Sequence, residues 1–268
     1  MKRIFIILSL FFLVLLILSF KKYENEQSDF PYKPGENLTY LIHYGFINGG
    51  KAFININNDL ILNKRAYHVK IQAKTTGIAD AIYKVTDTYE SYIDPLTDLP
   101  VKAIRNISEG KYKRYNEVLF DHESRTDSSL VYSQTSGLQV VPKNIHDILS
   151  GFYYMRKYYI TDDISIGDTI HIKTYFTDEL FPLSICYKGT ETIRTKLGKV
   201  KCYRFDPVTE VGRLFKTEND MSIWFSKDKN LIPVRIRFDI YVGSVKVDLV
   251  EYKGIKHDFE SLIKLDVK

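Results

Sequence analysis

The chain lacks the sequence signals by which many enzymes and metal proteins are identified. No two of its six histidines have the H-x-x-x-H or H-E-x-x-H spacing of a metal site. There is no G-x-S-x-G nucleophile elbow and no glycine-rich phosphate loop between a strand and a helix. We therefore expect a protein that is not an enzyme and that has no catalytic residue, metal site or cofactor.

Cysteine and excess charge are also scarce. The formal net charge is +5 over 268 residues, and the small basic excess is spread along the chain, which argues against nucleic acid as a partner. Cys186 and Cys202 are the two cysteines. If residues 196–198 form the turn between their strands, Cys202 faces about residue 192, too far from Cys186 for a disulfide. We expect two free thiols.

The chain has one long apolar run, at its N-terminus. Residues 4–20 are apolar except for two serines, and basic residues flank them on both sides. The pattern resembles a secretory signal, but no small-x-small cleavage site is evident, so an uncleaved anchor is the alternative. We expect export to the periplasm or cell envelope, with membrane contact only through residues 1–22 and a polar tether over 23–35.

Alternation of apolar and polar residues dominates the rest of the chain and predicts antiparallel β-structure. The clearest segment, 233–249, predicts a hairpin with Val234, Ile236 and Phe238 facing inward. A hairpin turn is predicted at 47–50 and a helical turn at 77–83. Further strands are predicted at 38–46, 51–57, 66–76, 85–93, 101–108, 112–120, 130–141, 169–175, 183–195 and 200–205.

Residues 144–159 have the spacing of a helix, with Asn144 as the predicted cap. Its apolar stripe comprises Ile145, Ile148, Leu149, Phe152 and Tyr159. The opposite face, predicted to be wet, comprises His146, Asp147, Ser150, Tyr154 and Lys157.

Arg156 interrupts the apolar stripe of this helix. One interpretation is that its guanidinium reaches water or the last helical carbonyls. The other is a buried arginine that binds a carboxylate of the sheet or an acidic headgroup. The aromatic residues Phe152, Tyr153, Trp224 and Phe238 could line a hollow for an acyl chain or simply fill it.

These patterns predict a mainly β fold: a curved antiparallel sheet or half-barrel of around a dozen strands wrapped on one central helix. The β domain is expected over 36–256, with a C-terminal tail at 257–268. Segments 91–104 and 222–238 resemble each other, each running from an aromatic strand through a polar turn to Leu, Pro, Val and a basic residue. Two related lobes, 36–142 and 161–256, joined by the helix are one explanation; a common way of building a hairpin is the other.

Four segments of the chain form a distinctive combination: YLIHYGFINGGKAFI, DILSGFYYMR, GKVKCYRFDPV and FKTENDMSIWFSKDKNLIPVRIRFDIYVGSVKVDLVEY. Together they resemble a bacterial exported family catalogued as domain of unknown function 3108. The resemblance implies an exported, mainly β envelope protein with no established activity. The Leu-Pro-Val turn is also similar to hairpins of LolA/LolB-type half-barrels, in which a curved sheet cups helices and apolar ligands.

Two functional hypotheses follow, with an enzyme of unknown type as a third. The first is a non-catalytic envelope protein that binds an apolar or lipid-like ligand through Arg156, Phe152, Tyr153, Trp224 and Phe238. The second is a structural or protein-interaction module whose core is filled. An interior cavity would distinguish the first from the second, because fold alone does not reveal function.

Overall fold

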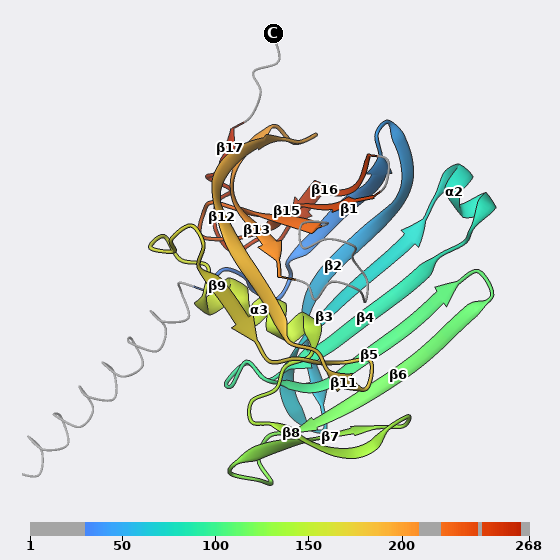
Figure 1. Cartoon of the computed structure of the whole chain (residues 1–268), viewed down its shortest axis with the longest axis vertical. Helices are drawn as coiled ribbons and strands as arrows, with labels where there is room; N and C mark the ends of the chain where they lie inside the picture. The colour runs from blue at the N-terminus through green and yellow to red at the C-terminus, as the bar shows by residue number, and fades with distance from the viewer. Residues whose placement is uncertain (1–29, 209–220, 241–242, 264–268) are drawn as a thin grey trace, which may run out of the picture.

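The computed structural model describes residues 30–208, 221–240 and 243–263, and these residues form a curved antiparallel sheet around one helix (Figure 1). The described helices are α2 (Gly77–Ile82) and α3 (Ile148–Tyr158). The strands are β1 (Asn37–Tyr44), β2 (Ile47–Ile61), β3 (Lys64–Thr75), β4 (Thr86–Ile93), β5 (Pro100–Glu109), β6 (Tyr112–Asp121), β7 (Ser128–Ser133), β8 (Gly137–Pro142), β9 (Thr169–Ile172), β10 (Tyr175–Phe176), β11 (Glu179–Leu180), β12 (Leu183–Arg194), β13 (Lys199–Pro207), β14 (Met221–Ser226), β15 (Pro233–Asp239), β16 (Ser244–Lys253) and β17 (Leu262–Ile263). The predicted fold class is confirmed.

The sheet joins the two halves of the chain side by side. Its strand order is β8-β7-β6-β5-β4-β3-β2-β1-β16-β15-β14-β13-β12-β9, with β17 on β13 and a separate β10-β11 hairpin. Because β1 pairs with β16, segments 36–142 and 161–256 belong to one hydrogen-bonded sheet. The sheet is open, with β8 and β9 at its edges.

The first hairpin turns earlier than predicted. Gly45 and Phe46 form the turn, whereas the predicted turn residues 47–50 lie within β2. A Cβ atom on Gly50 would lie 2.6 Å from the carbonyl oxygen of Lys74 on β3. This glycine therefore permits a close approach of two strands, which is the second common role of glycine in a sheet.

The C-terminal hairpin is confirmed, with one residue placed differently. β15 pairs antiparallel with β16, and Ile236 lies opposite Val247. Val234 falls in a register shift between β14 and β15 and has no partner on β14. It packs with Trp224 and Cys202, away from Ile236, so the expectation that Val234 faces the same way as Ile236 is wrong. A β-bulge changes side-chain direction in this way.

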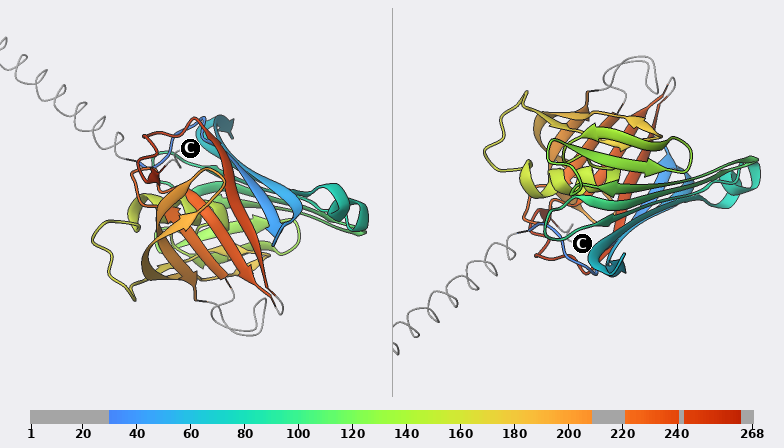
Figure 2. Two further views of the ribbon diagram at one scale, coloured as in Figure 1. Left: turned by 90° about the horizontal axis from the view of Figure 1, so that it is seen from above. Right: turned by 90° about the horizontal axis from the view of Figure 1, so that it is seen from below.

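Helix α3 lies between the two halves of the curled sheet (Figure 2). Leu149 and Tyr153 pack with residues of β1 to β4 and β16, and Met155 packs with residues of β9 and β12 to β14. Phe152 contacts both groups. The helix thus links two apolar clusters that the sheet alone would leave facing each other across a gap.

Both ends of the described chain pack onto the sheet. Tyr32, in the predicted tether, is buried, and in the predicted tail Ser261 donates a hydrogen bond to Asp228 at 2.6 Å. Residues 30–35 of the predicted tether and 257–263 of the predicted tail thus contact the β domain; residues 1–29 and 264–268 lie outside the described residues. None of the helices that the structure describes has the length and apolar character needed to span a bilayer.

Candidate functional site

The cap of helix α3 is Asp147, three residues after the predicted cap Asn144. The Asp147 carboxylate accepts hydrogen bonds from the backbone N–H groups of Leu149 and Ser150, and the Ser150 hydroxyl accepts one from the Asp147 N–H. Asn144 instead has a positive φ of 56° and precedes the helix. This reciprocal cap satisfies donors that the first turn of a helix leaves unpaired.

The predicted wet face of the helix is buried over its first turn. His146, Asp147 and Ser150 are each at most 5% exposed, and the Ser91 hydroxyl of β4 donates to Asp147 at 2.6 Å. Burial raises the pKa of the Asp147 carboxyl. Tyr159, predicted in the apolar stripe, is exposed. Periodicity failed here because sheet and loop enclose the start of the helix from several sides, whereas its end is open.

Arg156 is fully buried and binds a carboxylate. Its two terminal nitrogens lie 2.9 and 3.2 Å from the two oxygens of Glu36, which directly precedes β1. Nη2 also donates to the carbonyl oxygen of Asn230 at 2.9 Å. The rings of Tyr32 and Tyr153 lie against the guanidinium, with centroids 5.4 and 4.9 Å from Cζ. The interpretation that this side chain reaches water is wrong.

The Arg156–Glu36 pair has the charge states of a structural ion pair. Burial disfavours the charged guanidinium, but Glu36 raises the pKa of Arg156 above its usual value. Burial and the neighbouring Glu36 raise the pKa of Tyr153, so this phenol stays neutral. Because Glu36 occupies both terminal nitrogens, Arg156 is not available to a ligand headgroup, and Tyr153 is buried beside it.

Beyond the helix, the inner face of the sheet carries apolar side chains that are only partly buried. A helix of 11 residues is roughly 16 Å long, whereas β2 with 15 residues extends roughly 50 Å, so α3 covers only part of this face. Partly exposed side chains from four strands of the inner face pack against the same two core clusters as Phe152; they are Ile42, Ile71, Ala73, Ile236 and Val247. We call these five residues and Phe152 the inner apolar surface.

Arg105 of β5 borders this surface and was not predicted as a site residue. It pairs with Tyr89 across β4 and β5, and Tyr89 packs against the same cluster as Ile71. Its Cζ lies 5.2 Å from the ring centroid of Phe176 on β10. Nε and Nη1 of Arg105 are buried and have no hydrogen-bond partner among the described residues. Buried donors without partners are rare and call for an explanation.

The sequence carries a signal for Arg105 in the alternation of β5. Ala103, Arg105 and Ile107 are alternate residues of one strand, so the arginine occupies an apolar position, as Arg156 does on the helix. The bordering Phe176 carried no such signal. It reaches Arg105 from a two-residue-strand hairpin, β10-β11, whose position depends on tertiary packing.

The two remaining predicted residues lie apart from Phe152. Trp224 lies on the outer face, where Arg204 and Arg237 stack on its ring, and it packs with Cys202 and Val234. Its assignment to a hollow with Phe152 is therefore wrong. Phe238 pairs with Met221 and Val245 at the end of the inner face farther from the helix, two residues along β15 from Ile236. Only Phe152 of the five predicted residues belongs to the inner apolar surface.

Clusters that resemble catalytic groups are internally satisfied. His122 Nδ1 lies 2.9 Å from the Ser129 hydroxyl, and its Nε2 lies 3.0 Å from the carbonyl oxygen of Pro100. Ser129 is fully buried and also accepts a hydrogen bond from the Asn144 N–H, so no substrate reaches it. The Asp178 carboxylate likewise accepts hydrogen bonds from Asn116 and Ser133.

The described part of the chain contains neither a metal-binding cluster nor a disulfide. Across residues 30–208, 221–240 and 243–263, no group of three or more His, Cys, Asp or Glu side chains could hold a metal ion. Cys186 and Cys202 are both free, and Cys202 pairs with Glu191, one residue from the position predicted. The prediction of two free cysteines is confirmed.

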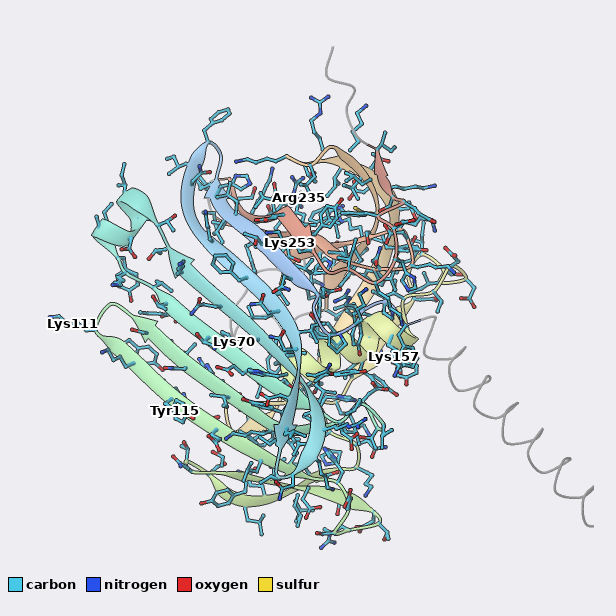
Figure 3. The ribbon with its side chains drawn as sticks, turned by 180° about the vertical axis from the view of Figure 1, so that it is seen from behind. Lys70, Lys111, Tyr115, Lys157, Arg235 and Lys253 are labelled. Atoms are coloured by element: carbon cyan, nitrogen blue, oxygen red, sulfur yellow. The ribbon has the colours of Figure 1, made fainter. Side chains whose placement is uncertain are left out.

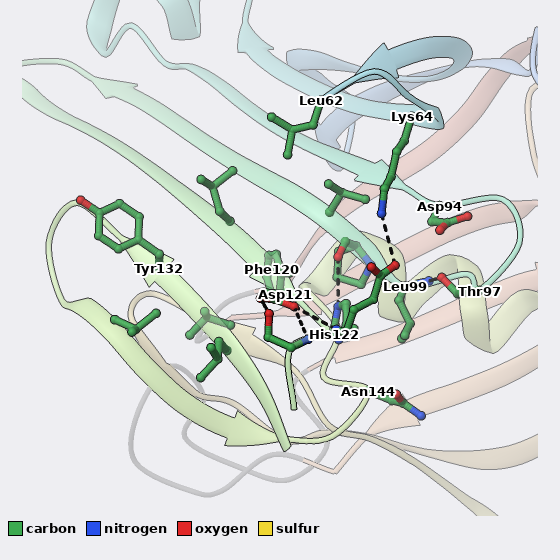
Figure 4. Close-up of a pocket in the computed structure, with 18 residues that line it drawn as sticks. Leu62, Lys64, Asp94, Thr97, Leu99, Phe120, Asp121, His122, Tyr132 and Asn144 are labelled. Carbon is green, nitrogen blue, oxygen red and sulfur yellow. Dashed lines mark hydrogen bonds and ion pairs between the residues drawn. The ribbon is translucent and has the colours of Figure 1, made fainter. Parts of the chain in front are cut away.

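Two shallow hollows lie at the end of the sheet near the β2-β3 turn. The first, of about 620 Å³, lies between β5 to β8 and contains His122 (Figure 4). The second, of about 1080 Å³, lies beside β2 and β3. The Lys64–Glu123 ion pair, at 3.2 Å, borders both. Their charged rims contain both signs, and no convergent set of polar groups marks either as a binding site.

Comparison with known proteins identifies a family and a fold. A family described as "Protein of unknown function (DUF3108)" matches residues 39–250. No curated protein matches the chain. A β-barrel-like protein of domain of unknown function DUF1849 from Brucella abortus has a TM-score of 0.53 at 10% identity, over 83% of this chain and 98% of its own. A hypothetical protein from Chlamydia trachomatis has a TM-score of 0.32 at 11% identity, over 91% of this chain and 98% of its own.

Proposed function

The chain belongs to the DUF3108 family, and we propose that it is a non-catalytic binding protein of the cell envelope whose ligand is an acidic amphiphile. The apolar chain of this ligand would lie on the inner apolar surface, and its carboxylate or phosphate would accept hydrogen bonds from the buried nitrogens of Arg105 once the Phe176 ring that packs on the guanidinium moves aside. Export through the N-terminal apolar segment is part of this proposal, and it is supported by the basic residues that flank residues 4–20.

The observation that carries the proposal is the pair of unpartnered nitrogens on Arg105 next to partly exposed apolar side chains. The two nitrogens point in different directions and Arg105 also hydrogen-bonds Tyr89, so each free N–H would donate singly to a carboxylate or phosphate oxygen; hydrogen bonds between charged groups are among the strongest in proteins. The partly buried Ile71 and Tyr89 lead from Arg105 across β4 to β3, towards Phe152. One cation at the end of an apolar surface is the complement of a molecule with one anionic end.

The inner face also carries acidic groups near the same end. Burial and the neighbouring Asp87 raise the pKa of Glu109, at the end of β5. Asp87 accepts a hydrogen bond from the Ser108 N–H at 3.0 Å. These carboxyls lie closer to the strand ends than Arg105, so they limit how far an anionic headgroup extends past the guanidinium.

The test is a binding titration with 11-(dansylamino)undecanoic acid as the probe. Dodecyl phosphate is expected to displace it, and dodecanol, which has no charge, is expected to compete at least tenfold more weakly. Arg105→Gln is expected to weaken binding of the acidic probe by roughly 10- to 100-fold, because a hydrogen bond to a charged group contributes roughly 1.5–3 kcal/mol.

Arg237→Gln is the matched control. Arg237 also has an unpartnered nitrogen and lies 5.5 Å from an aromatic ring centroid, but on the outer face, over Trp224. This variant is expected to bind the probe as the unchanged protein does. Equal losses in both variants, or no binding to the unchanged protein, would favour the structural hypothesis, in which the sheet only supports other envelope proteins. Native mass spectrometry of protein purified from its own envelope would identify a retained lipid.

A further inference from the structure

Three neighbouring turns at one end of the long strands expose a continuous set of apolar side chains. They are the β1-β2 turn, helix α2 between β3 and β4, and the β5-β6 turn (Figure 1). Hydrogen bonds join them: the Thr76 N–H donates to Gly49 at 3.0 Å, and the Gly110 N–H donates to Lys84 at 2.8 Å. The Tyr83 hydroxyl also donates to the carbonyl oxygen of Glu109. We call this region the hairpin tips.

The apolar side chains at the hairpin tips point away from the protein. Phe46 is 105% exposed, Ile78 78% and Ile82 80%, and Ile47 and Tyr83 are also exposed. Helix α2 has six residues and none is buried. A helix this short is not stable alone in water, and a helix normally turns its apolar side chains toward the protein. Here they remain exposed instead.

The exposed apolar side chains of the hairpin tips are surrounded mainly by lysines. Four exposed lysines, Lys74, Lys84, Lys111 and Lys113, make no ion pair within the described part of the chain. Lys111 lies at the tip of the β5-β6 hairpin (Figure 3). Two acidic residues lie among the tips. Asp80 is half-buried and bonded to the Thr75 hydroxyl at 2.8 Å, and Glu109, at the end of β5, is half-buried beside Asp87. The tips therefore combine aliphatic and aromatic groups with an excess of positive charge, four exposed lysines against two half-buried carboxyls.

The opposite end of the sheet differs in charge although it is also apolar. Leu60, Leu62 and Leu96 are exposed there. They are interspersed with Asp59, Asp94 and Glu123 as well as Lys64 and Arg65, and Lys64 is paired with Glu123. That end has no excess of positive charge, so it provides an internal control of similar exposed apolar character.

We propose that the hairpin tips dock on an anionic bilayer surface, with Phe46, Ile78 and Ile82 inserted among the lipids and the four lysines at the headgroups. Interfacial segments with aromatic and aliphatic side chains beside lysines bind membranes in this manner. The contact is additional to any made by the N-terminal segment. It would bring the Arg105 end of the inner face toward the bilayer, because Arg105 and the tip residue Gly110 belong to the same hairpin.

The test uses the full 268-residue chain reconstituted in vesicles whose lipids carry bromine on the acyl chains, which quench tryptophan on contact. Trp224 is buried and gives a constant background. The Phe46→Trp variant is expected to show a blue-shifted, quenched additional signal in vesicles that contain phosphatidylglycerol. The Leu62→Trp variant, at the opposite end, is expected to show neither effect. Vesicles of phosphatidylcholine alone should give little quenching in both.

Charge and insertion are then separated. Each Lys→Gln change at the tips is expected to weaken docking by about fivefold, and all four together should reduce the quenching to the phosphatidylcholine level. Ile78→Ser with Ile82→Ser should weaken it by roughly tenfold or more. Circular dichroism spectra and thermal midpoints equal to those of the unchanged chain would show that these surface variants fold.

Several results would overturn the proposal. They are equal quenching at Phe46→Trp and Leu62→Trp, quenching that persists after the four lysine changes, and equal quenching in both lipid mixtures. A tip that binds a protein and not a bilayer would leave Phe46→Trp unquenched. Arg105→Gln is expected to leave docking unchanged, so the failure of the inner-face ligand and the failure of membrane docking can be distinguished.

Discussion

The buried Arg156–Glu36 pair gives a prediction whose size follows from the structure. In Arg156→Met, the Glu36 carboxylate would keep its buried position and lose two hydrogen bonds, and the Asn230 carbonyl would lose one. Stranding one member of a buried ion pair costs about 3–5 kcal/mol, because the remaining charge is desolvated and unpaired. That is a large part of a total stability of about 5–15 kcal/mol.

A double variant separates the cost of the stranded Glu36 charge from the cost of losing the other contacts of Arg156. Arg156→Met with Glu36→Gln removes both charges, so it is expected to recover about half of the loss seen in Arg156→Met alone. Full recovery is not expected, because the methionine cannot donate to Asn230 or stack between Tyr32 and Tyr153. Arg125→Met is the control. Its ion pair with Asp127 is exposed, so its loss should be well under 1 kcal/mol.

The assay is equilibrium unfolding in urea, followed by the fluorescence of the buried Trp224. The free energy of unfolding should fall in the order unchanged protein, Arg125→Met, double variant, Arg156→Met. A loss below 1 kcal/mol in Arg156→Met would refute the reasoning, since it would mean that Glu36 finds water or protonates at no cost. A double variant no more stable than Arg156→Met would refute the idea that the stranded carboxylate causes the loss.

Two further predictions concern the same helix. Phe152→Ala is expected to reduce the free energy of unfolding by about 3 kcal/mol, the lower end of the range for an aromatic residue, because Phe152 is partly exposed. Tyr159→Ala, at an exposed position, should reduce it by less than 1 kcal/mol. Equal losses in the two variants would mean that the helix lies outside the core. Burial lowers the pKa of His146 from its usual 6.5 to about 4. Between these two pH values the unfolded chain therefore binds more protons than the folded chain. The free energy of unfolding should fall by roughly 2–3 kcal/mol as the pH drops from 7 to 4. Urea titrations across this range should show a flatter pH dependence of stability for His146→Gln than for the unchanged protein, and parallel curves for the two would contradict the assignment.

The sequence predicted those features that depend on local periodicity. Alternation located the strands of the main sheet, including the hairpin of β15 and β16, because each strand has one face against the core. The register between Cys186 and Cys202 followed from the turn at 196–198 to within one residue. The helix was found, but its start was not, since Asn144 and Asp147 are both good caps and only the surrounding sheet selects Asp147.

Most of the candidate site could not be predicted from the sequence. Which face of β14 lies inward depends on a bulge beside Trp224, and a shift of one residue exchanges the two faces. The partner of Arg156 is 120 residues away in the sequence, and no local pattern marks Glu36 as the carboxylate that it binds. Arg105 could have been selected for its apolar strand position. Its unpartnered nitrogens depend on neighbours that only the folded structure brings together.

The similarity between segments 91–104 and 222–238 has a structural basis that also explains how the helix is held. In both hairpins the register shifts at the proline, Pro100 or Pro233, and the residue two before that proline has a positive φ. Each turn then supplies an oxygen to α3. Asp98 accepts hydrogen bonds from Lys157 and Tyr158, while the Asn230 carbonyl accepts one from Arg156. Because adjacent residues of a helix point in different directions, Arg156 and Lys157 reach opposite halves of the sheet. The repeated hairpin therefore fixes α3 from both sides, and with the helix held at one end, the inner face along the remaining length of the strands is left partly exposed.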